Sequence, residues 1–493
     1  MPRTDAKADG ARESARGAGR TIAVIGAGFS GALTTLHLLK YCSPEDRILL
    51  IEKNQHFGLG LAYSTGNANH LLNVRASNMS AFADQPDDFV TWLQRLPAKE
   101  AAKLNEAPGP NSFVPRGLYG RYIQQLLGDR IWRPESDLNV FLVTDEAVAL
   151  HRRTEGDQSG PAWEIELAVG RRLAADRVIL AIGNFPAARA QPGIFKDPWH
   201  PQALDKLDPA APVLLLGTGL TMVDTVISLL DRGHRGPIHA VSRRGQLPRV
   251  HGAVAQPWRF AVPPQAHSLR QLVREIRATV RQAAKQGVDW RAVIDGLRPH
   301  TQRLWLDMPI AERQRFLRHL RPWWDVHRHR AAPRIHGRIT DAIDRGQLVI
   351  TAARLGRITP CIGTVEVEMT AKSAATTRLN VERVIDCTGL QGDCAKLDSP
   401  LIKQLLADGR IQPDQLHLGI ATNVTGAAID AQGRISDDLF VVGPMTKGTF
   451  WEIVAVPDIR RACEQLAVHI DGLLAHDRAR QRWQKTADLV AAH

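Results

Sequence analysis

Short apolar runs that end at glycine-rich turns recur along this chain of 493 residues. Two of them, Thr21–Ile25 and Val213–Leu216, lead through such a turn into a longer apolar segment, at 32–39 and 222–230. A continuous apolar run of this length is typical of a buried parallel strand, and a strand–turn–helix unit is the start of a βαβ fold. The pattern predicts an α/β fold with two Rossmann-like dinucleotide-binding domains.

The first turn has the spacing G-x-G-x-x-G over residues 26–31. Its glycines permit a tight turn, a close pyrophosphate and close helix packing, and the helix N-terminus favours an anion. The next apolar run ends in Glu52, 26 residues after Gly26, where a carboxylate holds ribose hydroxyls. Such an acid suits FAD or NAD, and the N-terminal position and later segments favour FAD. The expected contacts are Gly26, Gly28, Phe29, Ser30, Gly31, Glu52 and Lys53.

The second turn, Gly217-Thr218-Gly219, departs from the full fingerprint because Met222 stands where a third glycine or alanine is usual. The strand after it, 237–241, ends in Ser and two Arg residues instead of an acid. An acid would repel a 2′-phosphate, whereas Ser and Arg bind one. We therefore expect NADPH in preference to NADH, although two solvated surface arginines are the alternative. The expected contacts are Gly217, Gly219, Ser242, Arg243 and Arg244.

Three further apolar runs end in glycine, at 178–186, 384–389 and 439–444. Their form resembles the crossing strands and the C-terminal FAD segment of the flavoproteins that contain two dinucleotide-binding domains. The residues expected to approach a cofactor there are Gly183, Gly389, Gly443 and Pro444.

A closer resemblance is carried by Leu61–Thr65, His70–Val74, Ala81–Asp84, Gly443–Ile453 and Val456–Arg460. In these stretches the chain resembles the FAD/NAD(P)-binding proteins of the bacterial YdhS-like family, from residue 21 to about 465. Relatives with assigned roles include N-hydroxylating monooxygenases that act on amino acids such as aspartate. The resemblance implies FAD and NADPH as cofactors, and it is more specific for family membership than for the reaction.

The net charge of +12 is concentrated in one segment, since Lys and Arg outnumber Asp and Glu by 16 to 6 between residues 261 and 340. Apolar residues at helical spacing predict helices over 268–330. The segment is interpreted either as a lid, with Arg328 and Arg330 binding an anion, or as a packing and salt-bridging helical element. No nucleic-acid-binding motif accompanies the charge.

Composition narrows the class of protein further. Hydrophobic residues make up 44%, no apolar run is as long as a membrane span, and the five cysteines form no C-x-x-C pair. We expect a cytoplasmic protein without a metal site, a thiol redox centre, a nucleic-acid partner or a membrane partner. The polar, mixed-charge residues 1–20 are predicted to be a disordered tail.

The predicted domains interrupt one another along the chain. The FAD-binding domain is expected in two parts, 21–200 and 386–465, and the NADPH-binding domain in two parts, 201–265 and 333–385. A helical basic insertion is expected at 266–332 and a C-terminal helix at 466–493.

These expectations together indicate an FAD-dependent oxidoreductase that uses NADPH. The favoured reaction is hydroxylation of a small polar substrate, such as an amino-acid nitrogen, with O2 through a flavin hydroperoxide, because the flavin itself supplies the chemistry. The alternatives are a flavin reductase or dehydrogenase without oxygen insertion, and a non-catalytic FAD-binding redox sensor. Candidate active-site residues are Asn73, Lys447, Trp451 and Glu452, with turn capping, surface exposure or core packing as their other interpretations.

Overall fold

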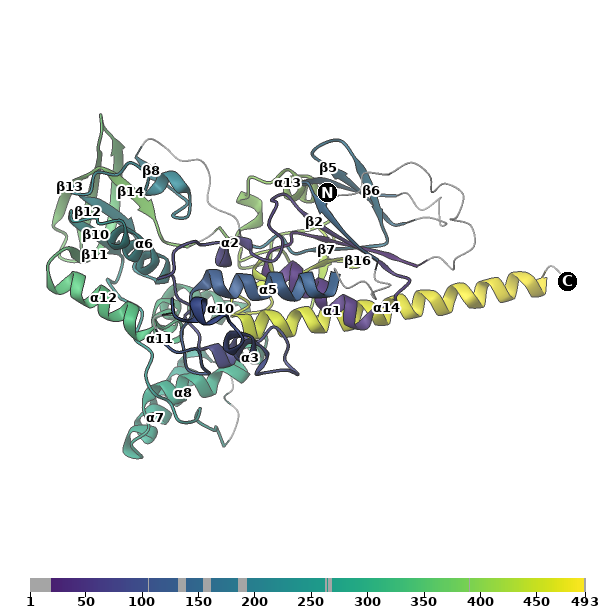
Figure 1. The fold of residues 1–493 in the computed structure, drawn as a ribbon, viewed down its shortest axis with the longest axis horizontal. Coiled ribbons are helices and arrows are strands. Elements are labelled where there is room, and N and C mark those ends of the chain that lie inside the picture. The colour runs from purple at the N-terminus through teal and green to yellow at the C-terminus, as the bar shows by residue number, and fades with distance from the viewer. Residues whose placement is uncertain are drawn as a thin grey trace.

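Two sheet-centred halves lie at opposite sides of the molecule in the computed structural model (Figure 1). The structure describes residues 19–104, 106–131, 139–153, 161–184, 193–261, 264, 268–389 and 391–491. The predicted tail therefore lies outside the described residues, except for its last two positions.

The first sheet has the strand order β15-β16-β7-β1-β2-β3, parallel except for the antiparallel pair β15 and β16. Its central strands are uninterrupted apolar runs, as burial of both sheet faces requires. Because β16 pairs with β7, the C-terminal part of the chain completes the N-terminal sheet. The strands are β1 (Thr21–Ile25), β2 (Arg47–Glu52), β3 (Asn139–Thr144), β7 (Arg177–Leu180), β15 (Ala427–Ile429) and β16 (Ile435–Val441).

The helix α1 (Phe29–Tyr41), which follows the first glycine turn, packs against the long helix α14 (Val456–Ala491) and against α5 (Arg116–Ile131). The far end of α14 extends beyond the rest of the fold (Figure 1). The helix α14 begins at Val456, before the predicted limit at residue 465 between the FAD-binding domain and the C-terminal helix. The division of the chain into domains stays a prediction. The shorter helices of this half are α2 (Gly60–Tyr63), α3 (Asp88–Gln94), α4 (Ala98–Ala101) and α13 (Pro400–Ala407).

A three-stranded antiparallel sheet also belongs to this half, formed by β4 (Ala147–Arg152), β5 (Trp163–Leu167) and β6 (Arg172–Ala175). One face is apolar because buried and part-exposed residues alternate along β5. The helix α13 packs against β4.

The second sheet has the order β13-β12-β11-β10-β9-β14-β8. The edge strand β8 comes from the stretch 21–200 that was predicted to belong to the FAD-binding domain. In the structure it pairs with β14 of this second sheet. The helices α6 (Leu220–Asp231) and α12 (Pro333–Asp344) share an apolar core with this sheet, and Met222 is fully buried in that core. The strands are β8 (Ile194–Phe195), β9 (Val213–Leu216), β10 (Ile238–Ser242), β11 (Leu348–Pro360), β12 (Val365–Ala371), β13 (Thr376–Val381) and β14 (Arg383–Asp386).

The basic segment between β10 and α12 is helical, as predicted. A π-helical turn at Phe316–Leu320 joins its last two helices, and α7 and α8 extend away from both sheets (Figure 1). The helices are α7 (Leu269–Lys285), α8 (Trp290–Leu297), α9 (Thr301–Asp307), α10 (Ile310–Arg315) and α11 (Arg321–Arg328). We call α7–α11 the helical insertion.

The described helices include none that is both long and apolar enough to cross a membrane. Within the same residues, no group of three or more His, Cys, Asp or Glu side chains is arranged to hold a metal ion. The mixed α/β fold with two Rossmann-like parallel sheets agrees with the sequence prediction.

Candidate functional site

The first glycine turn fits closely between the carboxyl ends of β1 and β7. Gly26 has φ +95°, and a Cβ on it would lie 2.5 Å from the carbonyl oxygen of Ala181. A Cβ on Gly31 would lie 1.8 Å from the carbonyl oxygen of Gly26. Gly28 begins α1 without a side-chain cap, and no acid lies in the first turn of that helix. The helix N-terminus is therefore suited to an anion such as a pyrophosphate.

Glu52 lies at the end of β2, directly beside this turn. Its Oε2 accepts a hydrogen bond of 2.8 Å from the backbone N–H of Ala27, and its Oε1 accepts from Asn54. Each carboxylate oxygen can accept more than one hydrogen bond, so ribose hydroxyls can be held at the same place. Lys53 is exposed, and its Nζ lies 3.8 Å from Glu146 Oε1.

The C-terminal segment returns to the same turn. Gly443 has φ +85°, and a Cβ there would lie 2.5 Å from Ser30 Oγ, so only a glycine lets the two segments meet. The chain then enters a short 3₁₀ helix at Pro444. Gly183, which follows β7, has open space where a Cβ would be, and so does Gly389, which follows β14 in the second sheet. The glycines of the first turn, Gly443, the uncapped helix and Glu52 together fit a dinucleotide.

Phe29 occupies a different environment from its neighbours in the turn. Its side chain is buried and meets Tyr63 edge to face, with ring centroids 5.5 Å apart. Any contribution of Phe29 to a cofactor therefore comes from its backbone.

The second glycine turn repeats the arrangement on the other sheet. Gly217 has φ +99°, and a Cβ there would lie 2.8 Å from the carbonyl oxygen of Cys387. Gly219 begins α6 without a side-chain cap and has open space beside it. Ser242 Oγ lies 2.9 Å from Thr218 Oγ1, which links the end of β10 to the turn. This site also fits a phosphate-bearing nucleotide.

The two arginines after β10 differ in their surroundings. Arg243 is exposed, and it forms no hydrogen bond or ion pair with any described residue. Arg244 donates a hydrogen bond of 3.1 Å to the carbonyl oxygen of His319 and lies 5.7 Å from the ring centroid of Trp323. Arg243 is thus the residue that remains available for a 2′-phosphate, whereas Arg244 binds the helical insertion.

A polar cluster joins the two halves of the molecule. Arg116, at the start of α5, forms an ion pair of 2.6 Å with Asp224 of α6. Burial raises the pKa of Asp224 to about 6, against the opposing effect of Arg116. His70 Nε2 lies 2.8 Å from Ser228 Oγ, and burial together with Arg116 lowers the pKa of His70 to about 4. The stretch His70–Val74 is thereby anchored on α6.

Three of the four predicted active-site residues lie against the helical insertion. The carboxylate of Glu452 is buried, with φ +69° at its backbone, and its Oε1 accepts a 2.8 Å hydrogen bond from Trp324 Nε1. Arg328 Nε is 3.3 Å from Glu452 Oε2, and His329 Nε2 is 3.4 Å from Oε1. Burial opposes ionisation, but His329, Arg328 and Trp324 outweigh it and hold the pKa of Glu452 well below its usual range.

Trp451 and Lys447 form the second part of this contact. The indole rings of Trp451 and Trp305 are stacked, with centroids 4.7 Å apart, and Trp305 Nε1 donates to the carbonyl oxygen of Gly448. Lys447 Nζ lies 5.0 Å from the centroid of Trp451. Burial lowers the pKa of Lys447, and Arg321 lowers it further.

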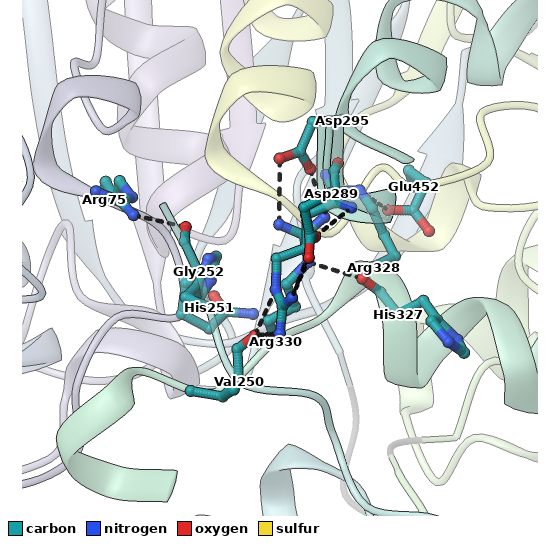
Figure 2. Close-up of polar contacts among 12 residues, drawn as sticks. Arg75, Val250, His251, Gly252, Asp289, Asp295, His327, Arg328, Arg330 and Glu452 are labelled. Carbon is teal, nitrogen blue, oxygen red and sulfur yellow. Dashed lines mark hydrogen bonds and ion pairs between the residues drawn. The ribbon is translucent and has the colours of Figure 1, made fainter. Parts of the chain in front are cut away.

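Asn73 lies elsewhere, on the loop that faces residues 250–252. Its carbonyl oxygen is 2.9 Å from His251 Nε2, and the neighbouring Arg75 donates to the carbonyl oxygen of Gly252. Figure 2 shows His251 and the contact between Arg75 and Gly252 to one side of Glu452. The structure therefore does not place Asn73 with Lys447, Trp451 and Glu452.

Arg330 has a structural partner. It donates two hydrogen bonds to Asp295 of α8, of 2.6 and 3.1 Å, and it is 2% exposed (Figure 2). This geometry supports the salt-bridging interpretation for Arg330. Arg328 differs, because its Nη2 is buried without a hydrogen-bond partner among the described residues.

The sequence prediction named Arg328 but did not pair it with Glu452. It also missed Arg116 and Asp224, whose ion pair is formed only where the two halves meet. The clustered Trp, His and Arg residues at 321–330 were a local signal for the first contact, whereas Arg116 and Asp224 had none.

A family model for FAD-NAD(P)-binding proteins matches residues 23–185. The matched stretch contains most of β1, the first glycine turn and Glu52. No curated protein sequence matches the chain.

Among solved structures, ornithine hydroxylase from Pseudomonas aeruginosa in its reduced form is similar, with a TM-score of 0.63 and 13% identity over 92% of this chain and 100% of that one. Ornithine N-hydroxylase from Kutzneria sp. 744 has a TM-score of 0.63 and 11% identity, covering 93% of this chain and 100% of that one. L-lysine 6-monooxygenase from Pseudomonas syringae has a TM-score of 0.60 and 14% identity, covering 92% and 99%. At these identities the likeness shows the shared fold.

Proposed function

We propose that the protein is an FAD-dependent monooxygenase that takes its reducing equivalents from NADPH. The observation that carries this proposal is the contrast between the two glycine turns. Glu52 stands beside one and the exposed Arg243 follows the other. The similar solved structures include ornithine hydroxylases and an L-lysine 6-monooxygenase, and this is the reason to propose an oxygenase reaction.

Each cofactor is assigned to residues of this chain. The uncapped start of α1 and Glu52 would hold the pyrophosphate and ribose of FAD. The uncapped start of α6 and Arg243 would hold the phosphates of NADPH. Bound FAD supplies hydride acceptance from the nicotinamide and the activation of O2. Lys447 would supply a positive charge at the site, and Trp451 beside it would help to exclude water.

The cysteines argue against a thiol-based reductase. Burial raises the pKa of Cys387, Cys394 and Cys463 to about 12, which keeps these thiols protonated and unreactive. All five cysteines are free, and Cys361 alone is exposed.

The test is to purify the protein with FAD and to follow NADPH oxidation, O2 consumption and product formation over a panel of amines, amino acids and organic acids. We expect one class of compound to stimulate NADPH oxidation and to gain one oxygen atom, detected with ¹⁸O2. NADPH-dependent reduction of FAD without oxygen incorporation into any compound would instead identify a reductase. Failure to bind FAD would contradict the proposal as a whole.

A further inference from the structure

A cavity of about 600 Å³ lies inside the helical insertion. Its walls come from α7, α8, α9 and α11, and Trp451 contributes from the other part of the chain. The volume falls within the range of about 300–1,000 Å³ that is typical of sites for small organic molecules. Its lining is almost entirely aliphatic and aromatic, which is unlike the small polar substrate expected from the sequence.

The apolar face of α7 opens onto this cavity. Leu269 and Leu272 are buried at one end of the helix, whereas Val273, Ile276 and Val280 line the cavity and keep part of their surface exposed. A helix normally covers such a face by packing against another element. Here a ligand would complete the packing.

Trp451 belongs to the segment that returns to the first glycine turn. It follows Gly443, which touches Ser30 in the first glycine turn, by eight positions. The indole is 2% exposed, and its Nε1 has no hydrogen-bond acceptor among the described residues.

The rim of the cavity is basic. A second hollow shares Leu269, Val273, Arg277 and Leu320 with the first, so the two adjoin. No acidic side chain lines the second hollow, and its basic side chains are Arg270, Arg274, Arg277, Arg281, Arg315 and His319. In the part of the chain that the structure describes, only Arg315 of these has an ion-pair partner, Glu312. This excess of positive charge complements an anion.

We propose that the helical insertion binds an apolar organic anion. The apolar body would fill the cavity as far as Trp451, and a carboxylate, sulfonate or phosphate group would lie against the arginines of α7. That this ligand is the molecule oxidised rests on the proposed function, whereas binding itself does not.

Binding is tested with two fluorescent probes titrated into the oxidised, FAD-loaded protein. The probe 8-anilinonaphthalene-1-sulfonate has the apolar body and an anionic group, and N-phenyl-1-naphthylamine has the same body without the charge. We expect saturable binding of both at one site, with the sulfonate bound more tightly at low salt and the difference reduced at high salt. Equal affinities at low salt would overturn the anionic assignment.

Two variants locate the site. Ile276→Glu places a carboxylate in the apolar cavity, so the affinity for both probes should fall more than about tenfold. Ala278→Glu places the same charge on the exposed face of α7, and it should leave the uncharged probe unaffected. Arg277→Gln should weaken only the sulfonate, by about threefold for one partly exposed charge. Circular dichroism and the FAD content check that each variant is folded.

Equal loss of the uncharged probe in Ile276→Glu and Ala278→Glu, or no loss in either, would show that the cavity is not the site. Probe binding that scales with protein self-association would instead assign the apolar face to a second copy of the chain, which also overturns the proposal. Binding without any NADPH-dependent oxidation of an apolar anion would leave this inference standing and would show that the bound anion is not the molecule oxidised, whereas failure to bind FAD would contradict the proposed function alone.

Discussion

Arg328 Nε lies 3.3 Å from Glu452 Oε2, and this buried ion pair ties the helical insertion to the segment that returns to the first glycine turn. Both side chains are less than one-tenth exposed. A buried charge that loses its partner is strongly destabilising, because neither water nor another group replaces the lost contact. The position of the insertion therefore depends on Glu452.

We predict that Glu452→Gln lowers the free energy of unfolding by about 3–5 kcal/mol, because the Arg328 charge stays buried without its counter-charge. Chemical denaturation followed by tryptophan fluorescence measures the change. The control Glu164→Gln removes an exposed ion pair with Arg172 and should change stability by less than about 1 kcal/mol. Equal effects of the two variants would contradict the structural role of Glu452.

Arg243→Gln should discriminate between the two nicotinamide cofactors. Loss of a charge-assisted hydrogen bond to the 2′-phosphate is worth about 1.5–3 kcal/mol, so kcat/KM for NADPH should fall at least about tenfold. The value for NADH should stay unchanged, since NADH has no such phosphate. Arg249→Gln, at another exposed arginine after the same strand, is the control. An equal loss with both cofactors in Arg243→Gln would exclude the phosphate contact.

Glu52→Ala should reduce FAD retention. The variant removes the acceptor for the Ala27 N–H and the proposed partner of the ribose, so the FAD-to-protein ratio after gel filtration should fall several-fold. Glu45→Ala removes an exposed carboxylate just before β2 and should retain FAD. Lys53→Ala tests the prediction that Lys53 contacts the cofactor. If this variant retains FAD, Lys53 does not contribute to FAD binding and only pairs with Glu146.

Stability should decrease in mild acid because of His70. Burial lowers the pKa of His70 to about 4, whereas the pKa in an unfolded chain is about 6.5. The unfolded state therefore binds more protons between these values, and stability is lost as the pH falls from about 6.5 towards 4. The contribution at pH 5 is at most about 2 kcal/mol.

Denaturation of the wild type and of His70→Gln at pH 7 and pH 5 measures this effect. The variant should be less stable at pH 7, because His70 contacts Thr65 and Ser228, and should lose less on acidification. Replacing the exposed His56 by Gln should keep the wild-type pH dependence. If His70→Gln lost as much free energy of unfolding between pH 7 and pH 5 as the wild type does, the prediction would be contradicted.

The core of the fold was predictable because its signals are local. The predicted strand Thr21–Ile25 has the observed bounds, the next predicted strand ends at Glu52 as expected, and the basic segment is helical. The candidate site was predictable only in part. Lys447, Trp451 and Glu452 lie together, but Asn73 lies apart, and Arg244 contacts the insertion.

The sequence by itself determined the two strand–glycine–helix units and the contrast between Glu52 and Arg243, because each depends on residues within one strand and the turn beside it. Only the tertiary structure decided that Gly443 meets Ser30, that Glu452 pairs with Arg328 and that α7 faces a cavity ending at Trp451. These relationships join segments far apart in the chain. They are set by packing, which depends on the shape and burial of all the elements together and leaves no local pattern.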